Sequence, residues 1–183
     1  KKSISFTLME NSMADTSTVD LQPDKNRLTL WLGYLGLIPF LVLLIEMTGA
    51  LASGVGVHGA SIFGFYAPYV FIAYSAIILS FLAGILWAKS RDFSQKKIAR
   101  SMIVFSNLLA LSGWASLLLI NISSMLMVFA VALLLCGYGS LLLAERSLDH
   151  DARDSQYWRM RLVLTMLVIC AHSLVLIYLI RDL

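Results

Sequence analysis

The fold is decided by the stretch YSAIILSFLAGILWAKSRDF, which covers residues 74–93. Its apolar run continues without a charge until Lys89 and Arg91, which follow directly after Trp87. An apolar helix of about 20 residues crosses about 30 Å of hydrocarbon, because each residue adds about 1.5 Å. Tryptophan and basic side chains are typical of the headgroup level where such a helix ends. We therefore predict a membrane-spanning helix that is anchored at the cytoplasmic face.

The rest of the chain repeats this pattern. Of its 183 residues 59% are hydrophobic and only 14% are charged. In soluble domains about half of the residues are apolar and about a quarter are charged. The predicted spans are residues 28–47, 66–87, 98–120, 124–143 and 161–180. Their continuous runs lack the alternation of a membrane β-strand. We predict an all-α polytopic bundle of five transmembrane helices, formed by residues 28–183 as one domain, with residues 1–27 as a mobile cytoplasmic tail.

Basic residues predict the orientation of this bundle. All of the 14 lysines and arginines except Arg181 fall on one side of the predicted membrane. Since cytoplasmic loops carry the excess of Lys and Arg, we expect the N-terminus inside and the C-terminus outside. The inner side is then either the cytoplasm or a mitochondrial matrix. The side chains expected to anchor the bundle at the membrane surface are Trp31, Trp87, Lys89, Arg91, Trp158, Arg159 and Arg161.

Small residues recur four apart in two of the spans. Lipid tails provide no hydrophobic drive for helices to associate, so close approach through small side chains has to supply the contact. We expect these two faces to lie at helix–helix contacts, within the subunit or against a partner. The residues are Ala76, Ser80, Gly84 and Ala88 in the second span and Ala132, Cys136, Ser140 and Ala144 in the fourth.

Ionisable groups at membrane depth are the main functional candidates, because they are costly there unless paired or hydrated. Glu46 and His172 meet this criterion, and His58 lies in the glycine-rich outer loop. With Asn107 they form a candidate polar pocket for a proton, a metal ion or a quinone headgroup. The simpler interpretation is that Glu46 reaches the headgroups, while His172 and Asn107 hydrogen-bond to neighbouring helices.

Patterns of known chemistry give no support for an enzyme. GVGVHG at residues 54–59 matches G-x-G-x-x-G, but it follows a membrane helix and lacks the strand and the acid that dinucleotide binding requires. Hydrolase, zinc-protease, thiol-redox and NTPase motifs are missing from the sequence. We therefore expect no catalytic residues, no metal site and no cofactor. We also expect no nucleotide or nucleic-acid partner. A bound lipid or a bound quinone remains possible as a ligand.

Four stretches in this order resemble one family: LGYLGLIPF at residues 32–40, YSAIILSFLAGILWAKS at 74–90, SNLLALSGWASLL at 106–118 and YWRMRLVLT at 157–165. The chain resembles the bacterial inner-membrane family called domain of unknown function 3429, to which mitochondrial transmembrane protein 69 is similar. The resemblance covers nearly all of residues 28–180. Ala83 and Ala88 stand where the family pattern is richer in glycine. The resemblance implies a bacterial inner membrane, which is an energy-transducing membrane, as the expected location, and it supplies no catalytic residues.

The expected function is a non-enzymatic accessory, assembly or stabilising subunit of a larger membrane complex. Its partners would be membrane lipids and other integral membrane subunits. The respiratory setting rests on the mitochondrial connection of the family. The alternative is a small transporter, or a protein that handles protons or metal ions through Glu46 and His172.

Overall fold

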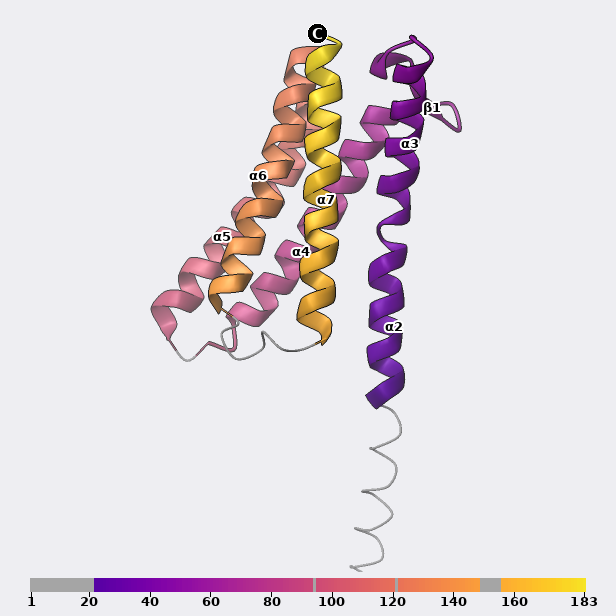
Figure 1. The fold of residues 1–183 in the computed structure, drawn as a ribbon. Helices are drawn as coiled ribbons and strands as arrows, with labels where there is room; N and C mark the ends of the chain where they lie inside the picture. The colour runs from indigo at the N-terminus through magenta and orange to yellow at the C-terminus, as the bar shows by residue number, and fades with distance from the viewer. Residues whose placement is uncertain (1–21, 94, 121, 149–155) are drawn as a thin grey trace, which may run out of the picture.

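Five long apolar helices make up most of the computed structural model, which describes residues 22–93, 95–120, 122–148 and 156–183 (Figure 1). The helices are α2 (Gln22–Leu35), α3 (Ile38–Ala52), α4 (Ala67–Ser90), α5 (Lys96–Leu119), α6 (Ser124–Leu148) and α7 (Gln156–Arg181). Helices α2 and α3 together form the first span, whose apolar part is Leu30–Ala52. The predicted all-α bundle of five membrane-spanning helices is confirmed. Most of the predicted tail, residues 1–21, lies outside the described residues.

The first span breaks at Gly36, because Pro39 in the first turn of α3 has no N–H to continue the hydrogen-bond ladder. The hydroxyl of Tyr74 on α4 donates to the Gly36 carbonyl at 2.9 Å. A side chain from a neighbouring helix thus satisfies a carbonyl at the break, as backbone in hydrocarbon requires. The predicted span of residues 28–47 therefore consists of two helical segments, and Pro39 in its sequence already predicts a kink near Gly36.

Helix α4 is the centre of the bundle, with α3, α5 and α6 packed against it, while α7 contacts α6 and both segments of the first span. In Figure 1 the first span stands at one side of the bundle and α5 at the opposite side. The buried core runs the length of α4, from Ala67 and Phe71 to Leu86.

Two ends of the bundle differ in chemistry. The basic end, as we call it, carries Lys89 in the last turn of α4, Arg91 on the connection to α5 and Lys96 at the start of α5. The loop end carries residues 53–66, which form a 3-10 turn, Val57–Gly59, and a two-stranded antiparallel hairpin, Ser61–Ile62 with Phe65–Tyr66. The carboxylate of Asp182, after α7, accepts a hydrogen bond from the Val57 N–H. The C-terminal end of α7 is therefore tied to this loop.

Close helix contact depends on glycines that the predicted small-residue stripes do not include. A Cβ added to Gly113 of α5 would lie 3.1 Å from both the Ala76 carbonyl oxygen and the Ser80 Oγ of α4. Gly137 of α6 approaches Leu79 of α4 in the same way. Ala76 and Ser80 therefore face α5, so this half of the second-span stripe lies at a helix contact inside the subunit.

The remaining stripe residues lie differently. Gly84 and Ala88 are exposed on α4, and a Cβ on Gly84 would meet no atom within 4 Å. In α6, Ala132, Ser140 and Ala144 are half-buried, whereas Cys136 is exposed. Cys170 on α7 is exposed as well. These exposed positions face the surroundings of the bundle and are open to lipid or to another protein.

Valine at Gly113 should destabilise the bundle, whereas valine at Gly84 should not. The added side chain at position 113 collides with the backbone of α4, and overpacking of this kind costs about 1–3 kcal/mol. Both substitutions place the same β-branched residue in a helix, so the change in helix propensity is matched. Thermal unfolding of the two variants in mild detergent tests this. Equal loss of stability in both variants would contradict the proposed α4–α5 contact.

Candidate functional site

A hydrogen-bonded polar cluster lies in the middle of the apolar core. It consists of Ser75 of α4, Tyr138 of α6 and His172 of α7, and each is at most 1% exposed. The Ser75 Oγ lies 2.6 Å from the His172 Nε2, and the Tyr138 hydroxyl donates to the Ser75 carbonyl at 2.9 Å. The cluster thus links three helices at one level of the bundle.

The contacts define the tautomer of the neutral His172 imidazole. His172 Nδ1 lies 2.8 Å from the Val168 carbonyl oxygen, which can only accept a hydrogen bond. Nδ1 therefore carries the proton and donates, and Nε2 accepts from the Ser75 hydroxyl. The Ser75 hydroxyl has only one hydrogen, so its 3.5 Å approach to the Tyr138 hydroxyl is a weaker contact.

Aromatic rings enclose His172. The ring centroids of Phe71, Tyr138 and Phe40 lie 4.8, 5.2 and 5.8 Å from that of the imidazole. Among the described residues, every buried side-chain nitrogen or oxygen has a hydrogen-bond partner. The arrangement joins helices in an apolar environment and leaves no open acceptor or donor beside His172.

A second buried polar contact is the ion pair between Glu145 of α6 and Arg161 of α7. The Arg161 Nε donates to one carboxylate oxygen at 2.8 Å, and a terminal guanidinium nitrogen contacts the other oxygen. The pair is bidentate, and the two side chains are only 7–9% exposed. Both residues lie within the apolar spans Ser124–Ser147 and Trp158–Arg181. Pairing offsets the desolvation of two charges that neither helix could carry alone.

This pair differs from the sequence-based expectation for both of its members. We expected Arg161 to anchor the bundle at the membrane surface, and the predicted fourth span ended at residue 143, before Glu145. In the structure α6 continues to Leu148, so Glu145 is part of the helix and faces α7. The spacing of Arg161, Thr165 and His172 on one face of α7 is the sequence signal that marks its buried side.

The four residues of the predicted polar pocket lie apart. Glu46 is exposed on α3, and Asn107 is exposed on α5, where its amide donates to the Ile103 carbonyl of its own helix. His58 lies in the outer loop, with its Nδ1 2.6 Å from the Tyr66 hydroxyl. Burial raises the pKa of the Tyr66 hydroxyl, and the negative charge of Asp182 contributes to this shift to a smaller extent. His172 alone is enclosed in the core.

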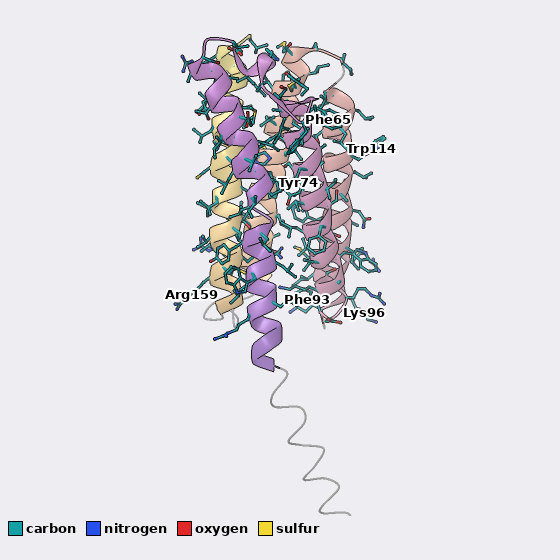
Figure 2. The ribbon with its side chains drawn as sticks, turned by 90° about the vertical axis from the view of Figure 1, so that its right-hand side faces the viewer. Phe65, Tyr74, Phe93, Lys96, Trp114 and Arg159 are labelled. Atoms are coloured by element: carbon teal, nitrogen blue, oxygen red, sulfur yellow. The ribbon has the colours of Figure 1, made fainter. Side chains whose placement is uncertain are left out.

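The predicted surface anchors are mostly exposed at the basic end. Trp31 and Arg159 are exposed, and Trp158 and Lys89 are half-buried. The Arg91 guanidinium lies 5.2 Å from the centre of the Trp87 ring, at cation–π distance. Figure 2 shows Arg159 and Lys96 at this same end of the bundle.

A groove of about 350 Å³ runs between the first span and helices α4, α6 and α7. Its walls are mainly apolar, with Phe40, Ile78 and Leu164 among them, and Arg161 and Thr165 are the polar residues at one side. Near the groove, Gly33 of α2 lies against Met160 and Leu164 of α7. The groove has the character of a space for lipid chains rather than for a water-soluble substrate.

The ion pair predicts a distinctive pattern of stability changes. Arg161→Met leaves the Glu145 carboxylate buried without its partner, which should cost about 3–5 kcal/mol. The double variant Glu145→Leu with Arg161→Met removes both charges and should recover most of that loss. Unfolding of the three proteins in mild detergent measures the pattern. A double variant as unstable as the single one would show that the pair is not the reason for the loss.

Ser75→Ala should destabilise the core by about 1–2 kcal/mol, because the His172 Nε2 loses its donor in a dry environment. The matched control is Ser112→Ala on α5, where the hydroxyl donates only to the Leu109 carbonyl of its own helix. Unfolding of the control should differ from that of the wild type by less than about 0.5 kcal/mol. Equal effects of the two substitutions would exclude a special contribution from the His172 contact.

Comparison with known proteins gives one match. No curated protein and no solved structure matches the chain. The likeness to mitochondrial transmembrane protein 69 thus stays a prediction. A family model covers residues 25–177, which include the first four spanning helices and most of the fifth. The chain therefore belongs to the family described as protein of unknown function DUF3429.

Proposed function

We propose that this protein is a non-enzymatic membrane subunit that binds another integral membrane protein through the outer face of α5. In this role it is an accessory, assembly or stabilising part of a larger complex. The setting we propose is a bacterial inner membrane, with a respiratory complex as the first candidate because the sequence resemblance implies an energy-transducing membrane. The proposal rests on one observation, which is that a polar residue, Asn107, is exposed on the outward side of α5 at the middle of this apolar helix.

The outer stripe of α5, as we call it, consists of Asn107, Leu111, Trp114 and Leu118. Its three apolar members are 52–59% exposed, and Asn107 is exposed as well. The spacing of four, three and four residues is that of a helix seam that packs against another helix. Trp114 projects away from the bundle in Figure 2. The stripe therefore has the pattern of a contact face and lacks a partner helix within the described residues.

Asn107 makes contact with lipid energetically unfavourable for this stripe. It lies 11 residues after Lys96 and 12 before Leu119, and thus about 17 Å from either end of α5. One N–H of its amide donates to the Ile103 carbonyl at 2.8 Å, and within the described residues its amide oxygen has no hydrogen-bond partner. A polar group left unpaired in hydrocarbon is costly, so a donor from a second protein would stabilise this position.

The alternative of ion handling has less support. Glu46 is exposed on α3, whereas His172 is enclosed by aromatic rings and fully hydrogen-bonded. A proton or metal-ion path through both residues would have to lead from the surface of the bundle into its apolar core. The outer stripe of α5, in contrast, already lies on the surface of the bundle, where a partner can reach it.

Substitution of the outer stripe should release the partner. In the variant Asn107→Leu with Trp114→Leu, we expect recovery of copurifying membrane subunits to fall at least tenfold, because an interhelical hydrogen bond and an aromatic anchor are lost. The measurement is purification of the tagged chain in mild detergent, followed by native electrophoresis and mass spectrometry of the comigrating subunits.

The matched control is Phe129→Leu with Cys136→Leu on α6, which also changes an aromatic and a small polarizable side chain on the exposed surface. Its subunit recovery should equal that of the wild type. Migration of the wild type as a sole monomer would refute the proposal. A complex made only of copies of this chain would refute the part that assigns the stripe to a different protein.

A further inference from the structure

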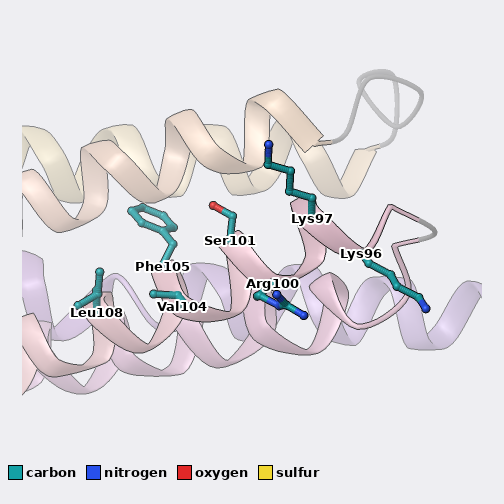
Figure 3. A pocket seen from close by; sticks show the side chains of 7 residues that line it. All are labelled: Lys96, Lys97, Arg100, Ser101, Val104, Phe105 and Leu108. Atoms are coloured by element: carbon teal, nitrogen blue, oxygen red, sulfur yellow. The ribbon is translucent and has the colours of Figure 1, made fainter.

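The first turns of α5 form a charged groove at the basic end of the bundle, away from the polar core. Its volume is about 730 Å³. The residues that line it are Lys96, Lys97, Arg100, Ser101, Val104, Phe105 and Leu108 (Figure 3). All of them except Phe105 are exposed, and Figure 3 shows Lys97, Ser101 and Phe105 on the same side of the helix.

Within the part of the chain that the structure describes, no ion pair neutralises the positive charge of this groove. Helix α5 contains no Asp or Glu in its sequence KKIARSMIVFSNLLALSGWASLLL. Among the described residues, no carboxylate forms an ion pair with Lys96, Lys97 or Arg100. The N-terminus of α5 adds the positive end of a helix dipole at the same place. The groove thus attracts an anion.

Polarity changes in a fixed order along the groove. The three cations lie within the first five residues of α5, Ser101 follows, and the lining is apolar from Val104 to Leu108. Lys96 and Leu108 are separated by about 18 Å along the helix. A phospholipid has the same order, with a charged headgroup, a polar glycerol region and an apolar acyl chain. A soluble anion or an acidic protein would match only the cationic third.

We propose that this groove binds one anionic phospholipid, with its phosphate at Lys97 and Arg100, assisted by Lys96, and with an acyl chain along Val104 and Leu108. Basic pockets beside transmembrane helices bind anionic lipid headgroups by this combination of charge and apolar surface. The three cations lie within the first five residues of α5, whereas the outer stripe begins at Asn107, so the phosphate contacts differ from the residues proposed to bind the protein partner.

The test is native mass spectrometry of the purified full-length chain titrated with dioleoylphosphatidylglycerol or dioleoylphosphatidylcholine. We expect one phosphatidylglycerol to bind at least tenfold more tightly than phosphatidylcholine. Each basic residue near an anionic lipid contributes about fivefold in affinity. Lys97→Gln and Arg100→Gln should each show that loss, and the triple variant with Lys96→Gln should lose roughly a hundredfold.

The matched control replaces three other exposed arginines, in the variant Arg27→Gln with Arg91→Gln and Arg146→Gln, and so makes the same change in net charge. It should bind phosphatidylglycerol like the wild type. The proposal would be overturned by equal losses in the two triple variants, or by equal binding of the two lipids. Displacement of the lipid by millimolar glycerol 3-phosphate would also overturn it, since it would show a phosphate site without a contribution from the apolar half.

Discussion

The scarcity of hydrogen-bond partners in hydrocarbon is the constraint that shapes this bundle. Water is not present to pair with a polar group at membrane depth, so each group has to find its partner on the same helix or on a neighbour. The break in the first span has its partner in Tyr74, and the His172 imidazole has its partners in Ser75 and Val168. These contacts determine which faces of the helices turn inward, because a rotation of any one helix would leave a polar group unpaired.

Asn107 does not follow this rule within the described residues. Its side chain is turned outward at the middle of α5, beside an exposed Trp114. A bundle that pairs its buried polar groups, yet has an amide on its outer side, resembles a soluble protein with an exposed apolar patch, and this likeness supports the partner that we propose. For a membrane protein, the equivalent of that patch is a polar residue within an apolar helix–helix seam.

The sequence was sufficient for the features that depend on position along the membrane normal. The number of spans follows from run lengths, and the break at Gly36 follows from Pro39, because both depend only on local chemistry. The polar contacts depend instead on how each helix is rotated about its axis. Glu46 and His172 are both ionisable residues in spans, but they project to different surroundings, and hydropathy alone contains no information about that angle.

The Glu145–Arg161 pair could not be predicted from hydropathy for a related reason. A carboxylate lowers the apolar score of a segment, so a span that is identified by apolar residues ends before it, at residue 143. A paired carboxylate and guanidinium nevertheless belong inside the helix bundle, because each removes the cost of the other. Span prediction from single residues therefore shortens helices at the positions where two of them are joined by charge.

The two polar contacts of α7 also explain why this helix has a single register. Apolar helix surfaces rich in Leu, Ile and Val are similar from turn to turn, so dispersion alone discriminates weakly between positions one turn apart. Arg161 contacts α6 and His172 contacts α4, and they are 11 residues apart, which is about 16 Å along the axis. Sliding α7 by one turn would break both contacts at once and leave a buried charge unpaired. Two specific contacts at different depths therefore define both the axial position and the rotation of α7. An apolar core of the same size without these contacts would define them less strictly.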